Sequence, residues 1–269
     1  MTRASSEKQT AEDLRPPTRV QGRDAAAQLD PDAAWLAVLR RVSAARKKLG
    51  CERNGAWFRG HANRDWPLLP TLLRYPHGPQ KEQNLYYQFV SRAGPLIAQQ
   101  TSSWEVLSQM RHHGVPTRLL DWTESLAVAV HFALSGSTNL PCVWVLNPYQ
   151  LTKLSLGKHW ILNMELDERH RYDHAFVRYE NEWPYRLPVA VDSPWRNRRL
   201  AAQSGYFTLH GTDARPLEQQ CRKLVVKVEI PENAVAGCRR FVQHAGINEF
   251  SLFPDLDGLA RWLKSKYDF

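Results

Sequence analysis

Two short segments constrain this chain more than any other part of its sequence. Residues 57–61 read Trp-Phe-Arg-Gly-His, and residues 112–123 read His-His-Gly-Val-Pro-Thr-Arg-Leu-Leu-Asp-Trp-Thr. In each segment an apolar run typical of a buried strand meets Gly, Pro, His, Arg or Asp residues, which favour turns and polar contacts. Because buried polar groups need hydrogen-bond partners, the two segments predict a site built where buried strands end.

The hydrophobic pattern predicts a single α+β domain over residues 29–269, with a mixed or split β-sheet flanked by helices. Apolar residues make up 43% of the 269 residues, which is enough for a sizeable core. Residues 1–28 are polar and include Pro16 and Pro17, so a disordered N-terminal tail is predicted there. The remainder shows no internal repeat and no clear linker.

Local signals place the individual elements. Strands are expected at residues 56–60, 142–147, 206–210, 224–230 and 250–253, and helices after Asp30, over 81–110 with a break near Gly94, over 125–134 and after Asp255. Asp121 followed by Glu124 is typical of a helix N-cap with its capping-box partner. Residues 148–200 are expected to be irregular. The last helix is expected to bury Leu256, Leu259, Trp262 and Leu263.

The charge of the chain favours polyanionic partners. The formal net charge is +9 and the pI is about 9.5, and such an excess raises encounter rates with polyanions. RNA or DNA is the candidate partner. The alternative is that the arginines are scattered over a solvated surface and bind no particular partner. A charge excess alone indicates electrostatic attraction of polyanions and not a specific binding site.

Nothing in the sequence resembles a membrane-crossing or secretory segment. No apolar stretch approaches about 18 residues, and the first ten residues lack an apolar core. A cytoplasmic location without a membrane partner is therefore expected. The chain has four cysteines and none forms a CxxC pair, so they are interpreted as reduced, partly buried side chains: Cys51, Cys142, Cys221 and Cys238.

Arg59 and Gly60 end the first predicted strand. A guanidinium group suits phosphate or carboxylate recognition, and a glycine lets a ligand or another backbone approach closely. The alternative is an internal ion pair between Arg59 and Asp121 that holds two segments together. From the residues alone, both interpretations stay open.

The histidines give no convincing metal site. His112 and His113 are adjacent, and adjacent side chains point to different sides of an extended chain. His170 and His174 have the spacing of a zinc clamp on a helix, but no third ligand follows at a defined distance. No metal is therefore predicted.

Common nucleotide and hydrolase motifs are missing from the sequence. It contains no GxxxxGK[ST], no GxGxxG and no GxSxG pattern. Glu249 precedes an apolar run, where a carboxylate is either a rim residue or a group aimed into a cleft. The second arrangement is the one that stabilises an oxocarbenium-like transition state.

These segments resemble the FRG domain family, named for its (Phe/Tyr)-Arg-Gly motif. The resemblance rests on residues 57–61 and 113–123 and on the small-residue helix at 127–133. Residues 203–208 and 252–258 also fit, so the resemblance spans residues 50–265. The FRG family is similar in layout to ADP-ribosyltransferases, and some of its members look like toxins or phage-defence effectors.

The resemblance implies an ADP-ribosyltransferase-like fold that consumes NAD as a substrate. Arg59 would grip the NAD, and Glu249 would be the catalytic carboxylate, since residues 248–250 look like the Asn-Glu-Tyr of poly(ADP-ribose) polymerases. Trp57, Trp122 or Tyr206 could stack on a base. The chain departs from the superfamily pattern because it has no Ser-Thr-Ser triplet. The other residues implied in the NAD site are Gly60, His61, His113, Thr117, Arg118, Asp121, Trp122 and Thr123.

Three functions remain open from the sequence. The first is ADP-ribosyl transfer to RNA, DNA or protein, which in a toxin would require an antitoxin or immunity partner. The second is a non-catalytic nucleic-acid-binding module. The third is a metal-dependent nuclease or other hydrolase that uses His113, Asp121 and Glu249.

Overall fold

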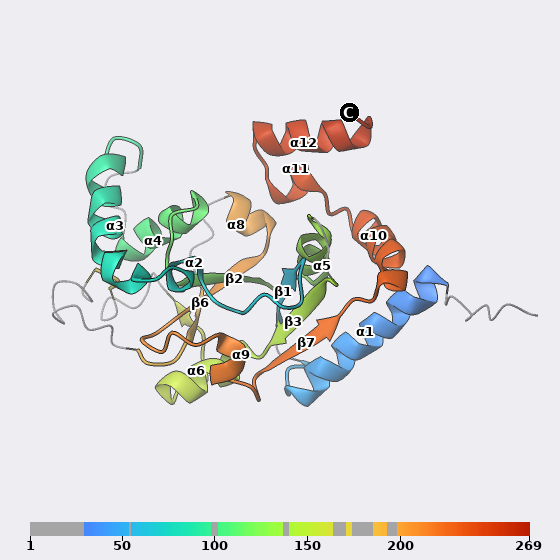
Figure 1. Cartoon of the computed structure of the whole chain (residues 1–269), viewed down its shortest axis with the longest axis horizontal. Helices are drawn as coiled ribbons and strands as arrows, with labels where there is room; N and C mark the ends of the chain where they lie inside the picture. The colour runs from blue at the N-terminus through green and yellow to red at the C-terminus, as the bar shows by residue number, and fades with distance from the viewer. Residues whose placement is uncertain are drawn as a thin grey trace, which may run out of the picture.

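The protein is seen in a computed structural model that describes residues 30–53, 55–97, 102–136, 140–163, 171–173, 185–192 and 198–269. The predicted tail at residues 1–28 and the pair His170 and His174 lie outside these ranges. The centre of the molecule is a seven-stranded sheet in the order β4-β5-β6-β2-β1-β3-β7, with helices packed around it (Figure 1). In the described ranges, no helix is both long and apolar enough to cross a bilayer.

The sheet is mixed, as the sequence predicted, because β4 and β5 are parallel while the other neighbouring strands are antiparallel. The strands are β1 (Trp57–His61), β2 (Leu119–Thr123), β3 (Cys142–Leu146), β4 (Leu162–Asn163), β5 (Val189–Asp192), β6 (Gly205–Leu209) and β7 (Val225–Glu229). The helices are α1 (Pro31–Lys48), α2 (Thr71–Arg74), α3 (Gly78–Ala93), α4 (Ser103–His112), α5 (Leu126–Leu134), α6 (Pro148–Leu156), α8 (Arg198–Ala202), α9 (Leu217–Gln220), α10 (Val235–His244), α11 (Glu249–Leu252) and α12 (Leu256–Lys266), with a 3-10 turn at Glu232–Ala234.

β1 and β2 are neighbours that separate soon after they meet. Their register is recorded at Phe58 opposite Thr123, whereas β1 pairs with β3 along its full length and β2 pairs with β6 along its full length. In a continuous antiparallel ladder Gly60 would stand opposite Asp121. The divergence therefore opens the sheet between Gly60 and Asp121, near its middle.

Three apolar clusters hold the helices on the sheet. The first joins α1, α5 and α10 to one face of β1, β3 and β7, and includes Phe58. The second joins α3 and α4 to β2, β5 and β6. The third lies with α6 and α9 and includes Trp57. Neighbouring Trp57 and Phe58 enter different clusters because successive side chains of a strand point to opposite faces.

Gly60 allows α5 to lie directly on β1. A Cβ at this position would stand 1.9 Å from the carbonyl oxygen of Ala129 and 2.5 Å from the nitrogen of Ala133. Both obstacles are backbone atoms of α5, so a side chain cannot be accommodated by a rotamer change. Of the two uses that the sequence suggested for this glycine, close approach of another backbone is the one observed.

Several predicted elements are confirmed. Asp30 caps α1 by accepting a hydrogen bond from the nitrogen of Asp32, and the chain leaves the helix at Gly50, whose φ is +65°. The predicted break near Gly94 separates α3 from α4. The strands predicted at 56–60, 142–147, 206–210 and 224–230 correspond to β1, β3, β6 and β7.

Other predictions were wrong. Asp121 lies within β2 and is not a helix N-cap; Ser125 caps α5 instead, by accepting from the nitrogen of Val128. Residues 250–253 do not form a strand, because the side chain of Asn248 accepts from the nitrogens of Phe250 and Ser251 and starts the short helix α11. Within 148–200, which was expected to be irregular, α6 begins directly after β3.

The predicted buried face of the last helix was wrong in part. α12 begins where expected, with Asp255 as its N-cap, but Leu256 is 83% exposed and Leu263 is 39% exposed. The buried residue of α12 is Gly258, which lies against Phe253. The periodic apolar pattern was read correctly as a helix, but two of its four residues, Leu256 and Leu263, are exposed, while Leu259 and Trp262 are half-buried.

Replacement of Gly60 by alanine should destabilise the fold by about 3 kcal/mol or more, because the added methyl group meets the backbone of α5. Urea unfolding monitored by circular dichroism measures the loss. Gly94→Ala is the matched control, since its added Cβ would have 3.8 Å of clearance from the nearest heavy atom. Equal midpoints for Gly60→Ala and the wild type would contradict the packing described above.

Candidate functional site

A pocket of about 670 Å³ opens where β1 and β2 diverge. Its walls come from β1, β2, α4, α5, α8 and the segment that follows β1. Among the described residues that line it, Asp121 is the only carboxylate, facing four arginines and three histidines: Arg59, Arg74, Arg111, Arg199, His61, His112 and His113. The pocket therefore carries a formal excess of positive charge, in a volume typical of small-molecule sites.

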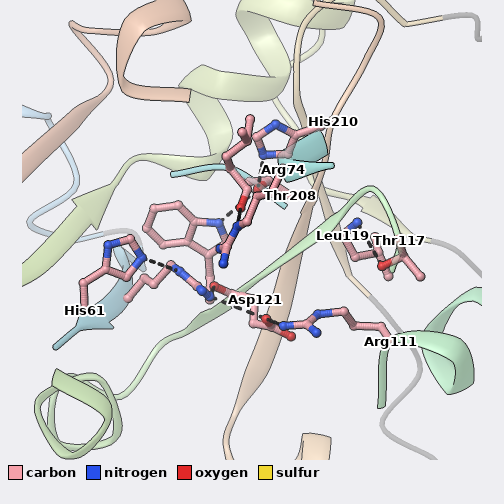
Figure 2. Close-up of polar contacts among 11 residues, drawn as sticks. His61, Arg74, Arg111, Thr117, Leu119, Asp121, Thr208 and His210 are labelled. Carbon is pink, nitrogen blue, oxygen red and sulfur yellow. Dashed lines mark hydrogen bonds and ion pairs between the residues drawn. The ribbon is translucent and has the colours of Figure 1, made fainter. Parts of the chain in front are cut away.

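Arg59 bridges the two diverging strands. Its Nη1 donates to the backbone oxygen of Asp121 at 2.7 Å and lies 3.5 Å from the Asp121 carboxylate (Figure 2). Its Nε donates to Nε2 of His61 at 3.0 Å. Burial lowers the pKa of Arg59 to about 10, with Asp121 opposing the shift and Arg111 adding to it. The group is still a cation at neutral pH, and the internal pairing with Asp121 that the sequence suggested is confirmed.

Asp121 is held between two guanidinium groups. Arg111 from α4 donates to Oδ2 of Asp121 (Figure 2), the same oxygen that Nη1 of Arg59 approaches. Burial raises the pKa of this carboxyl, but Arg111 and Arg59 more than offset that effect, so the pKa lies below its usual value. The Asp121 side chain nevertheless remains 42% exposed. It is thus an ionised carboxylate that a ligand in the pocket can reach.

His61 stays neutral and orients Arg59. Burial, and secondarily the charge of Arg59, lowers the pKa of His61 to about 3. Since Nε2 accepts the hydrogen bond from Arg59, the ring proton resides on Nδ1. A neutral acceptor at this position fixes the guanidinium plane without neutralising its charge.

The family comparison covers the centre of this site. Residues 54–140 match the FRG domain, a range that contains β1, β2 and three of the four pocket arginines. Over this range the chain is similar to the FRG domain. No curated protein and no solved structure matches the chain at a significant level. The ADP-ribosyltransferase-like layout therefore rests on the sequence resemblance alone.

Three arginines of the pocket were missed by sequence reasoning: Arg74, Arg111 and Arg199. Arg111 immediately precedes the segment 112–123 that the sequence singled out. Arg74 lies at the end of α2, where its Nε donates to the oxygen of Leu69 at 2.9 Å. Arg199 lies in α8, outside the range matched by the family. The sequence did show Arg199, as part of the basic run at residues 196–199, but nothing in the run indicated a pocket.

Most of the predicted binding residues lie together in this pocket. Arg59, Gly60, His61, His113, Asp121, Trp122 and Thr123 all line it. The hydroxyl of Thr123 donates to the oxygen of Gln203 at 2.6 Å and accepts from the nitrogen of Ser125 at 3.0 Å. It therefore joins β2 to the segment that follows α8 and does not present a free hydroxyl to a ligand.

Thr117 and Arg118 do not line the pocket. Thr117 is buried and accepts a hydrogen bond from the nitrogen of Leu119. Arg118 is buried and forms an ion pair with Glu82 at 2.6 Å, and Tyr172 donates to the same carboxylate at 2.8 Å. These residues tie β2 to α3 and stabilise the wall behind the pocket.

Glu249 also lies outside the lining of the pocket. It stands at the start of α11, where its carboxylate is 3.2 Å from Nε2 of His131 and 3.2 Å from Nε of Arg261. These contacts fasten α11 and α12 to α5. A catalytic role for Glu249 stays a prediction, but its contacts describe a fastening residue.

A metal-dependent mechanism finds no support in the described ranges. They contain no group of three or more His, Cys, Asp and Glu side chains placed to hold a metal ion. His112 and His113 stand edge to face with ring centroids 4.8 Å apart and direct their rings differently. All four cysteines are free, as predicted from their spacing, and they are fully buried where partial burial was expected.

Two buried histidines, His61 and His210, make the fold sensitive to acid. The pKa of His61 and that of His210 are each lowered to about 3, chiefly by burial, whereas an unfolded histidine titrates near 6.5. Between these values the unfolded chain binds more protons, so the free energy of unfolding falls as the pH falls from 6.5 towards 3. At pH 5 each of these histidines should lower the free energy of unfolding by about 2 kcal/mol.

Urea unfolding at pH 7 and pH 5 tests this expectation. In His61→Asn the amide oxygen can still accept the hydrogen bond from Arg59. The decrease in the free energy of unfolding between pH 7 and pH 5 should be smaller than in the wild type by about 2 kcal/mol, the contribution of one histidine. His244→Gln, an exposed position in α10, is the matched control and should keep the wild-type loss. An unchanged pH dependence in His61→Asn would show that His61 takes up a proton in the folded state.

Proposed function

We propose that this FRG domain binds NAD as a substrate and transfers its ADP-ribose group to an acceptor. The observation that carries the proposal is the convergence of four arginines and a single carboxylate on one pocket. A cluster of guanidinium groups is favourable only when anions neutralise it, and one carboxylate leaves most of that charge available to a ligand. A diphosphate matches this need because guanidinium groups recognise phosphate oxygens in pairs.

The four arginines divide between two roles. Arg59 and Arg111 already contact Asp121, so they are fixed in position before a ligand arrives. Arg74 and Arg199 reach the pocket from α2 and α8. We assign Arg74 and Arg199 to the outer oxygens of the diphosphate, and Arg59 and Arg111 to the side nearer the reacting ribose.

Asp121 is the carboxylate that we assign to catalysis. When the glycosidic bond of NAD breaks, its electron pair leaves with nicotinamide, which departs as a neutral molecule and leaves positive charge on the ribose. A lone pair of the acceptor then forms the new bond to the ribose, and the proton of the acceptor passes to solvent. An ionised carboxylate held within the pocket would stabilise the charge of the transition state. The low pKa of Asp121 suits this electrostatic role and not that of a general base.

The basic character of the chain supports a nucleic-acid acceptor. With a net charge of +9, the protein would concentrate RNA or DNA near the mouth of the pocket. Under this proposal the activity would be harmful in the cell that makes it, so the role would be that of a toxin or anti-phage effector with an antitoxin or immunity partner.

Inorganic pyrophosphate tests the binding half of the proposal directly. Isothermal titration at low salt should show binding to the wild type and roughly tenfold weaker binding to Arg74→Gln, because one charge-assisted hydrogen bond is lost. Arg92→Gln, an exposed arginine in the last turn of α3, removes the same charge outside the pocket and should leave the affinity nearly unchanged. Equal weakening in both variants would mean that general charge, and not the pocket, binds the anion.

Nicotinamide release from NAD tests the catalytic half. Asp121→Asn should reduce turnover by roughly 10²–10³-fold while NAD binding is kept or strengthened, since two arginines lose a competing anion. Glu249→Gln should keep activity within a few-fold, because Glu249 contacts His131 and Arg261. The reverse pattern would assign the catalytic carboxylate to Glu249.

The second candidate function is a non-catalytic nucleic-acid-binding module, which the positive charge favours. It would be indicated by a wild type that releases no nicotinamide with added RNA, DNA or cell lysate but binds a polymer with steep salt dependence. In that case Arg59 and Asp121 would act as structural residues that hold β1 and β2 together.

A further inference from the structure

Trp66 is the exposed aromatic side chain of the pocket. It lines the cavity together with Arg59 and His61, yet 53% of its surface is exposed. The other aromatic side chains of the lining are partly or fully buried; they are Phe58, Trp122, Phe132 and Phe207. A large indole left open to solvent beside a polar pocket is typical of a surface that a ligand covers.

The aromatic residues that the sequence suggested for stacking are not available. Trp57 is fully buried and stacks on Tyr206 with ring centroids 4.7 Å apart. Trp122 is buried and donates from Nε1 to the hydroxyl of Thr208 at 3.1 Å (Figure 2). These three rings support the sheet, which leaves Trp66 as the candidate for contact with a ligand.

The segment that carries Trp66 is fixed at several points. The nitrogen of Trp66 donates to the oxygen of Asn63 at 3.2 Å, and the nitrogen of Arg64 donates to the oxygen of Leu140 at 3.0 Å. On the far side, the nitrogen of Leu68 donates to the carboxylate of Glu218 at 3.1 Å. The indole is therefore displayed by a tethered turn, which reduces the entropy lost when a ring stacks on it.

His61 places the indole next to the guanidinium group of Arg59. The imidazole of His61 lies edge-on to Trp66 with centroids 6.1 Å apart, and the same ring accepts the hydrogen bond from Arg59. One five-membered ring thus separates an aromatic surface from a phosphate-binding group. In a nucleotide, one ribose separates the base from the phosphates in the same way.

We propose that Trp66 stacks on a heteroaromatic base of the ligand, so that the pocket selects nucleotides over base-free phosphates. The inference rests on the proposed function in one respect, because it takes the arginines to bind the phosphates. It goes further by assigning the second recognition element of the pocket, the residue that contacts the base. The base is either adenine or nicotinamide, and both are tested below.

The experiment compares three ligands by isothermal titration: inorganic pyrophosphate, ADP and nicotinamide mononucleotide. Trp66→Ala should weaken binding of at least one of the two nucleotides by roughly 5–100-fold, the range for loss of a stacked base. Pyrophosphate affinity should stay within about twofold, because no base is present. Trp66→Phe retains an aromatic face and should recover most of the nucleotide affinity.

Trp160→Ala is the matched control, and the pattern of binding distinguishes a failure of the Trp66 role from a failure of phosphate binding. Trp160→Ala removes an indole that is 50% exposed but lies outside the pocket lining, and it should bind all three ligands as the wild type does. If Trp66→Ala binds both nucleotides normally, or loses pyrophosphate as strongly as the nucleotides, the stacking role is overturned while the phosphate pocket stands. If the wild type binds none of the three, the phosphate-binding function fails, and the role of Trp66 fails with it.

Discussion

The hydrogen bond from Arg59 to the backbone oxygen of Asp121 is the interaction on which the site depends. β1 and β2 are in register at Phe58 and Thr123 and then separate, so the backbone of β1 does not reach Asp121. Arg59 reaches it instead, with a side-chain donor at 2.7 Å. A buried carbonyl without a partner would be costly, and the guanidinium group removes that cost while keeping the strands apart. The pocket exists because a side chain replaces part of the ladder.

The same arrangement explains why the pocket is electrostatically incomplete. Asp121 neutralises part of the charge of Arg59 and Arg111, and its own ionised form is stabilised by them. The lowered pKa of Arg59 shows the opposite effect, since burial and the neighbouring Arg111 both disfavour its charged form. An anion entering the pocket would relieve this repulsion. Asp121 therefore offsets only part of the repulsion between the neighbouring guanidinium groups.

Sequence reasoning found the parts of the site that are local in the chain. Residues 57–61 and 112–123 gave Arg59, His61 and Asp121, because strand ends dense in polar residues need partners. It failed where burial or distant packing decides. Arg118 and Thr117 carry the same residue types as true pocket residues, but the distant Glu82 takes Arg118 into the core. The apolar period of α12 could not reveal that Leu256 and Leu263 are exposed. The strand expected at 250–253 was overridden by the Asn248 cap.

The pocket is completed from outside the matched FRG range by Arg199, and the C-terminal helices hold that residue in place. The ring of Phe253 lies between two guanidinium groups, 4.4 Å from that of Arg199 and 5.1 Å from that of Arg261. Arg261 is in turn held by Glu249, which also contacts His131 of α5. The amide of Gln203 donates to the oxygen of Leu252 at 3.1 Å and secures the adjoining segment.

Glu249, which the sequence suggested as the catalytic carboxylate, therefore acts on the pocket indirectly. It anchors the helices against which Arg199 packs. These cation–π and ionic contacts hold the C-terminal helices to the pocket although Leu256 and Leu263 of α12 are exposed.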